Sequence, residues 1–125
     1  MDRESNIRSE ISSLEGKIRE YQEHINYLRQ AETKIQTKLI FFEDDIYLKI
    51  KAYSISDNDY WLGDDADAAT EQKDYHCKVL ASLSSEVEDL IYDIRQTISK
   101  YETLITECRY RISSLKSELD AILEE

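Results

Sequence analysis

The sequence predicts an all-α protein: a long, coiled-coil-like antiparallel hairpin of two helices that associates further into a four-helix bundle. Its composition is the first reason, because the 125 residues include two glycines and no proline, and 34% are charged. Long helices have this composition. Apolar residues also recur at alternating steps of four and three along most of the chain, which is a heptad pattern. The pattern lapses near the midpoint, where the only tryptophan and a glycine lie.

We expect the first arm over about residues 4–55, with Asp2 or Ser5 as its N-cap. Glu32 and Lys49 interrupt its heptad stripe, each next to an apolar residue. The stripe consists of Ile7, Ile11, Leu14, Ile18, Tyr21, Ile25, Leu28, Ile35, Leu39, Phe42, Ile46 and Tyr53.

A second apolar surface is predicted on the far side of this helix from the stripe. One partner arm cannot cover both sides of a helix, so we expect a second chain to pack here or the distal turn to fold over it. We assign this surface to a partner interface. Its residues are Ile40, Phe41, Tyr47 and Leu48.

The turn is predicted at about residues 56–64. Residues 54–59 are mostly Ser, Asp and Asn, which favour turns and caps over helix interiors. Gly63 permits backbone conformations that other residues avoid. Trp61 either closes the end of the interhelical seam or anchors a partner, and we take Trp61 and Gly63 together as the turn motif.

The second arm is expected over about residues 65–123. It has two heptad series, one running from Leu80 to Ile122 and the other from Ile91 to Leu119. A third stripe lies beside them and widens the apolar face beyond a two-stranded seam, as in a four-helix bundle. We therefore assign this third stripe, Leu83, Leu90 and Leu104, to the partner interface.

The two arms are similar in length, so residues 1–125 form one hairpin domain in this prediction. Antiparallel pairing about the midpoint places opposite each other residues whose numbers sum to roughly 124. Tyr21 should therefore lie against Tyr101 or its neighbours.

The net charge of −11 comes from 27 acidic and 16 basic residues, and most of it belongs to the second half of the chain. Nucleic acids and anionic membranes bind clustered basic residues, and the sequence has no such cluster, so we expect no nucleic-acid partner. No apolar run reaches the roughly 18 residues that span a bilayer, so we expect no membrane insertion. The polar N-terminus does not resemble a signal peptide, so synthesis in the cytoplasm is expected, with any export by a route that cleaves no signal.

No residue pattern indicates catalysis, a metal or a cofactor, so we expect a non-enzymatic protein. His24 and His76 fall on opposite arms, and neither has the neighbouring ligand pair of a metal site. Cys77 and Cys108 lie 31 residues apart in one predicted helix. That separation is roughly 46 Å at 1.5 Å per residue, too far for a disulfide, and the sequence gives these cysteines no role.

Two helical arms joined by Trp61-Leu62-Gly63 resemble the WXG-motif (Esx-like) helical hairpins of Gram-positive type VII secretion. Ala66 and Ala69 at the start of the second arm, and Tyr75 beyond them, fit the same pattern. Within that superfamily the chain is most similar to the small helper proteins that accompany LXG-type toxins. It departs from the pattern in being longer and in lacking a Tyr-x-x-x-Asp/Glu export signal near its C-terminus.

The resemblance implies a chaperone that targets a toxin for secretion by binding the toxin's helical N-terminal domain. It also implies that a second small helical helper can join the bundle, or that the chain forms a homodimer. Two other functions stay open on the sequence: a structural coiled-coil adaptor, and an acidic immunity protein that masks a basic toxin.

Overall fold

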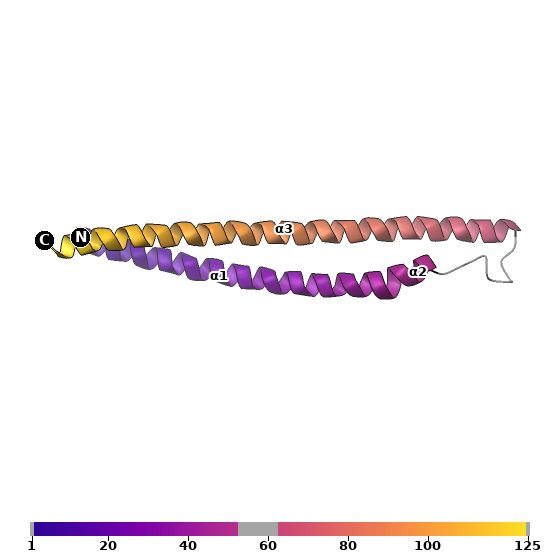
Figure 1. Cartoon of the computed structure of the whole chain (residues 1–125), viewed down its shortest axis with the longest axis horizontal. Coiled ribbons are helices and arrows are strands. Elements are labelled where there is room, and N and C mark those ends of the chain that lie inside the picture. Colours follow the sequence, from indigo (N-terminus) through magenta and orange to yellow (C-terminus); the bar gives the residue numbers. More distant parts are fainter. Residues whose placement is uncertain (1, 53–62, 125) are drawn as a thin grey trace. The chain divides into compact units, whose positions relative to one another are not determined.

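The structure is a computed structural model that describes residues 2–52 and 63–124. In chain order these residues form α1 (Arg3–Phe41), the π-helix η1 (Phe42–Tyr47), α2 (Leu48–Ala52) and α3 (Gly63–Leu123) (Figure 1). No strand occurs within the two described ranges. The predicted all-α helical hairpin is confirmed.

The predicted turn motif is only partly within the described residues. Gly63 is the first residue of α3, close to the predicted start of the second arm. Trp61 lies outside the described residues, as does most of the turn predicted at 56–64. The role of Trp61 stays a prediction.

The chain comprises two compact units, so its single-domain organisation also stays a prediction. The terminal unit combines Met1–Ala31 with Ile94–Glu125, and the central unit is Glu32–Asp93. In the terminal unit the start of α1 runs antiparallel to the end of α3. In the central unit the rest of α1, with η1 and α2, accompanies the first part of α3.

Asp2 is the N-cap of α1, one of the two predicted candidates. Its side-chain Oδ1 accepts a hydrogen bond from the Ser5 backbone N–H at 2.7 Å. Its carbonyl accepts a further bond from the Asn6 N–H at 3.2 Å. An N-cap of this kind satisfies a helix-end donor and contributes about 1 kcal/mol.

The heptad stripes of both arms meet in the terminal unit and form its core. Leu115 is the most deeply buried side chain, with 2% of its surface exposed. Around it the core consists of Ile7, Ile11, Ile112 and Leu119, with Leu14, Ile18 and Ile122 packed against them. Burying apolar surface at about 25 cal/mol per Å² makes this cluster the main stabilising feature of the unit.

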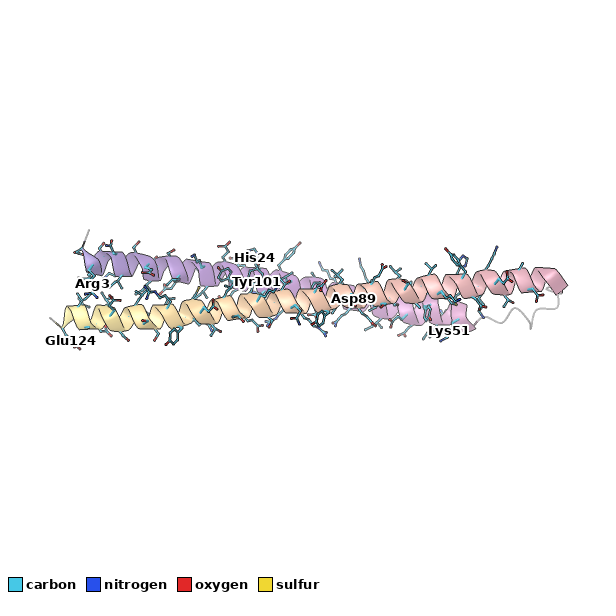
Figure 2. The ribbon with its side chains drawn as sticks, turned by 90° about the horizontal axis from the view of Figure 1, so that it is seen from above. Arg3, His24, Lys51, Asp89, Tyr101 and Glu124 are labelled. Atoms are coloured by element: carbon cyan, nitrogen blue, oxygen red, sulfur yellow. The ribbon has the colours of Figure 1, made fainter. Side chains whose placement is uncertain are left out.

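Polar and aromatic contacts across the terminal unit fix its register. Tyr21 lies against Tyr101 with ring centroids 5.6 Å apart, which confirms the predicted pairing. His24 stacks on the same tyrosine at 5.2 Å (Figure 2).

Ion pairs also join the two helices of this unit. Arg111 contacts Glu10 at 3.2 Å, Arg29 contacts Glu102 at 3.0 Å, and Arg3 pairs with Glu118. These side chains are largely exposed, so each pair contributes less than about 1 kcal/mol. The ion pairs therefore help to fix which residues of α1 lie opposite which residues of α3, and they add little to the stability of the unit.

Truncating the core should cost far more than the same truncation at the edge of the seam. Leu115→Ala should lower the free energy of unfolding by about 3 kcal/mol, because it leaves a cavity in a packed core. Leu104→Ala, on the same helix but 37% exposed, should cost less than about 1 kcal/mol. Urea denaturation followed by circular dichroism measures both, and equal losses would contradict the burial pattern.

Candidate functional site

Buried and exposed apolar residues are distributed very differently between the two units. Of the eleven buried hydrophobic residues in the described ranges, ten belong to the terminal unit and only Ile91 belongs to the central unit. Of the thirteen large exposed hydrophobic residues in the same ranges, nine belong to the central unit. Concentrated exposed apolar surface marks sites of protein association. The central unit is therefore where a binding site is expected.

The π-helix η1 changes which side of the first arm faces α3. The Leu48 backbone N–H donates to the Glu43 carbonyl, five residues earlier, so this turn holds more residues than an α-helical turn. The inward positions consequently advance by one residue. Glu43, Tyr47 and Ile50 are half-buried, whereas Ile46 and Lys49 are exposed.

The prediction that Ile46 continues the seam is therefore wrong, since 39% of its surface is exposed. The prediction that Tyr47 lies on the far side of the helix is also wrong, because the π turn leaves Tyr47 half-buried on the side that faces α3. Continued α-helical geometry would have pointed Lys49 at α3, and the extra residue in the π turn places Ile50 there instead. The interruption of the heptad stripe at Lys49, next to Ile50, was the sequence signal for this shift.

An apolar groove of about 280 Å³ lies between the two helical segments of the central unit. Leu83 and Leu90, both assigned to a partner interface from the sequence, contribute one wall and are 45% and 49% exposed. The remaining lining residues are Ile35, Lys38, Leu39, Phe42, Ser84 and Val87. Its apolar walls can receive the side chains of another amphipathic helix.

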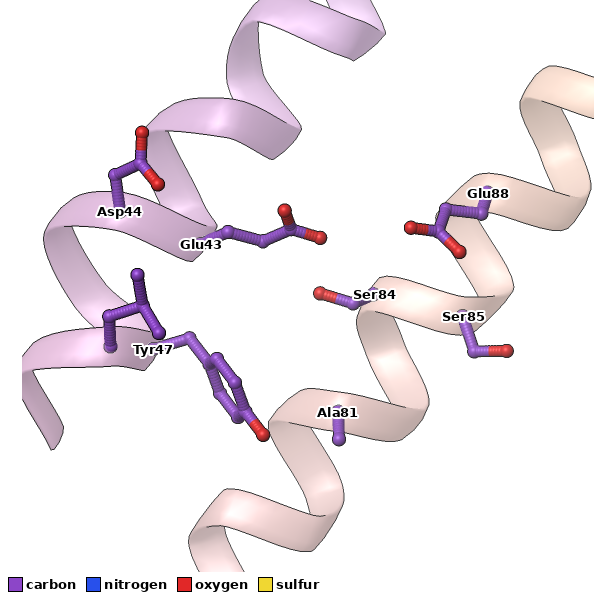
Figure 3. Close-up of a pocket in the computed structure, with 8 residues that line it drawn as sticks. Glu43, Asp44, Tyr47, Ala81, Ser84, Ser85 and Glu88 are labelled. Carbon is purple, nitrogen blue, oxygen red and sulfur yellow. The ribbon is translucent and has the colours of Figure 1, made fainter. Parts of the chain in front are cut away.

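A second groove in the central unit, of about 340 Å³, is acidic. Figure 3 shows the Glu43 carboxylate of η1 pointing toward α3 and the Glu88 carboxylate of α3 pointing back toward η1. The other lining residues are Asp44, Tyr47, Leu48, Ala81, Ser84 and Ser85. Within residues 2–52 and 63–124, no ion pair joins Glu43 or Glu88 to a basic side chain.

Ser84 lines both grooves and occupies a seam position between Leu80 and Val87. Its Oγ exposes less than 1 Å² and has no hydrogen-bond partner. Figure 3 shows the hydroxyl directed into the acidic groove. Buried polar atoms without a partner are rare and costly, so this hydroxyl is a candidate contact for a bound group.

The remaining predicted interface residues lie in different places. Ile40 and Phe41 are each 59% exposed and line neither groove, while Leu48 is exposed at the edge of the acidic groove. Leu104 belongs to the terminal unit. The structure thus brings Leu83 and Leu90 to one groove and Tyr47 and Leu48 to the other.

Glu43, Ser84 and Glu88 were missed by sequence reasoning. Glu43 directly follows Phe42 of the heptad stripe and lies one helical turn after Leu39, so periodicity places it beside the stripe and not in it. Ser84 had a detectable signal, because it occupies a heptad position between apolar residues.

Metal-binding arrangements are missing from the described part of the chain. No three His, Cys, Asp or Glu side chains gather there as a metal site would require. Cys77 and Cys108 are free thiols. None of the described helices has an apolar stretch suited to crossing a bilayer.

A family model of YwqH-like proteins matches residues 3–124, nearly the whole chain. The chain belongs to the YwqH-like family. YwqH-like proteins are LXG-associated helical proteins, in keeping with the resemblance to LXG-toxin helpers in the sequence. No curated protein and no solved structure matches the chain.

The register shift in this YwqH-like protein can be tested with two neighbouring isoleucines. Ile46→Gln should change the free energy of unfolding by less than about 0.5 kcal/mol, because the side chain is exposed. Ile50→Gln should lower it by about 1 kcal/mol, because a half-buried apolar side chain becomes polar. Chemical denaturation compares the two variants, and the reverse order would indicate an uninterrupted α-helix in place of η1.

Proposed function

We propose that this YwqH-like chain is a non-enzymatic targeting chaperone that binds the helical N-terminal domain of an LXG-type toxin for type VII secretion. Its family supports an LXG association. The observation that carries the proposal is the contrast between the units: among the described residues, the terminal unit holds ten of the eleven buried hydrophobic side chains, and the central unit holds nine of the thirteen large exposed ones.

This contrast suits a protein whose central unit completes its apolar core only when a partner binds. The terminal unit has the packed cluster needed to hold its helices together without a partner. The central unit has an apolar groove whose leucines are about half exposed. A helix of the toxin domain that lies along this groove would bury Leu83 and Leu90. The two helices of the unit would then form part of a helical bundle, which is the arrangement that an apolar face wider than a two-helix seam favours.

Co-expression with the N-terminal domain of an LXG toxin from the same genome tests the proposal. We expect a stable complex on size-exclusion chromatography, with a mass by light scattering that gives its stoichiometry. That mass also separates a complex with the toxin domain from a homodimer of this chain. No complex with any such toxin domain would contradict the proposed function.

Replacing the groove leucines should abolish this complex. The double variant Leu83→Glu with Leu90→Glu places two carboxylates in an apolar groove, and the cost of desolvating them should weaken binding at least about 100-fold. Leu123→Glu is the matched control, because Leu123 is 55% exposed and outside the groove. Isothermal titration calorimetry measures the affinities, and unchanged binding by the double variant would remove this groove from the interface.

A further inference from the structure

The acidic groove of the central unit has a carboxylate on each of its two helical walls. Glu43 and Glu88 point toward each other across it (Figure 3). Neither carboxylate has an ion-pair partner among the described residues, so both can accept hydrogen bonds from a cationic side chain. Lys51 contacts a different lining residue, with its Nζ 5.9 Å from the ring centroid of Tyr47.

The buried hydroxyl of Ser84 is an independent observation that favours a hydrogen-bonding ligand at this groove. Its Oγ is closed to solvent, lacks a hydrogen-bond partner, and is directed into the same groove. A hydroxyl can accept a hydrogen bond from a guanidinium or ammonium group while the two carboxylates accept others. Arginine carries five donors in a fixed plane and suits several acceptors at once.

The negative charge of the central unit favours a basic partner over a second copy of this chain. Residues 32–93 include 15 acidic and 6 basic residues, a net charge of −9, whereas the terminal unit has 12 acidic and 10 basic residues, a net charge of −2. A second copy of this chain would bring another central unit of −9 to the same face. Repulsion between the two would oppose a homodimer here and favour a basic partner.

We propose that the acidic groove receives an arginine or lysine from a basic partner helix, with the cation held between Glu43 and Glu88 and hydrogen-bonded to Ser84 Oγ. The partner is the toxin domain of the proposed function, on which this identification rests. The π-helix η1 supplies Glu43 and Tyr47 to the site, and α3 supplies Ser84 and Glu88.

The first test measures binding of the toxin N-terminal domain by calorimetry at 50 and 300 mM NaCl. Glu43→Gln with Glu88→Gln keeps the side-chain size but removes both charges, and should weaken binding about tenfold at low salt while flattening its salt dependence. Glu15→Gln with Glu107→Gln is the matched control, because it removes two exposed acids from the terminal unit. Equal affinities of the acidic-groove variant and the control would overturn the inference and leave the proposed function standing.

Ser84→Ala supplies an independent readout. In the free chain it removes an unsatisfied buried atom, so the thermal midpoint should stay the same or rise. In the complex it removes a hydrogen bond, so binding should weaken. A loss of thermal stability without a loss of affinity would show that the hydroxyl serves the hairpin itself, and would contradict its role in the site.

A second probe keeps the inference testable when the toxin domain does not bind. This probe is a designed amphipathic helical peptide with leucines at heptad positions and two arginines one turn apart, compared with a peptide that has glutamine at both arginine positions. The arginine peptide should bind the wild-type chain at least about tenfold more tightly, and the Glu43→Gln/Glu88→Gln variant should lose that preference. This result without toxin binding would refute the proposed function alone, whereas no arginine preference would refute the cation site.

Discussion

The apolar seam of the terminal unit is the interaction on which the rest of the structure depends. Leu115 and its neighbours bury their side chains between the start of α1 and the end of α3. Most helical stability in proteins comes from burial of this kind rather than from intrinsic propensity. The seam joins segments from opposite ends of the chain, and so commits the polypeptide to doubling back.

The central unit is built from the same helices with less buried apolar surface. Its seam includes Ser84, where the terminal unit has isoleucine or leucine at the equivalent heptad positions. A serine at this position lowers the stability of the isolated unit, since a hydroxyl gains less from burial than an apolar side chain. Binding sites are commonly drawn from such less stable regions, and the two grooves lie in this unit.

The π-helix η1 determines which residues at the end of the first arm face α3. A straight α-helix would present Ile46 and Lys49 to α3, whereas the helix interrupted by η1 presents Tyr47 and Ile50. The π turn therefore leaves Lys49 in solvent and places Ile50 toward α3. Tyr47 lines the acidic groove as a result, and π-helical turns are frequent at functional sites.

Much of the fold was predictable because a heptad repeat indicates which residues of each helix face the partner helix. The pairing of Tyr21 with Tyr101 followed from the equal length of the arms, and the exposed stripe of Leu83 and Leu90 followed from its position beside the seam. The π turn left only an indirect signal, the interruption of the stripe at Lys49 beside Ile50, because periodicity does not show how a helix accommodates such a break. The acidic groove was not predicted because Glu43 and Glu88 lie beside the apolar stripes, where charged residues are usual in helices.

Amide hydrogen exchange of the free chain, read by mass spectrometry, tests most directly whether the two units differ in packing. Slow exchange is expected across residues 7–25 and 98–119, where buried residues hold the helices together, and faster exchange across 35–50 and 77–90. Equal protection of all four segments would show that the central unit is as firmly packed as the terminal unit, and would contradict the view that its apolar surface is kept for a partner.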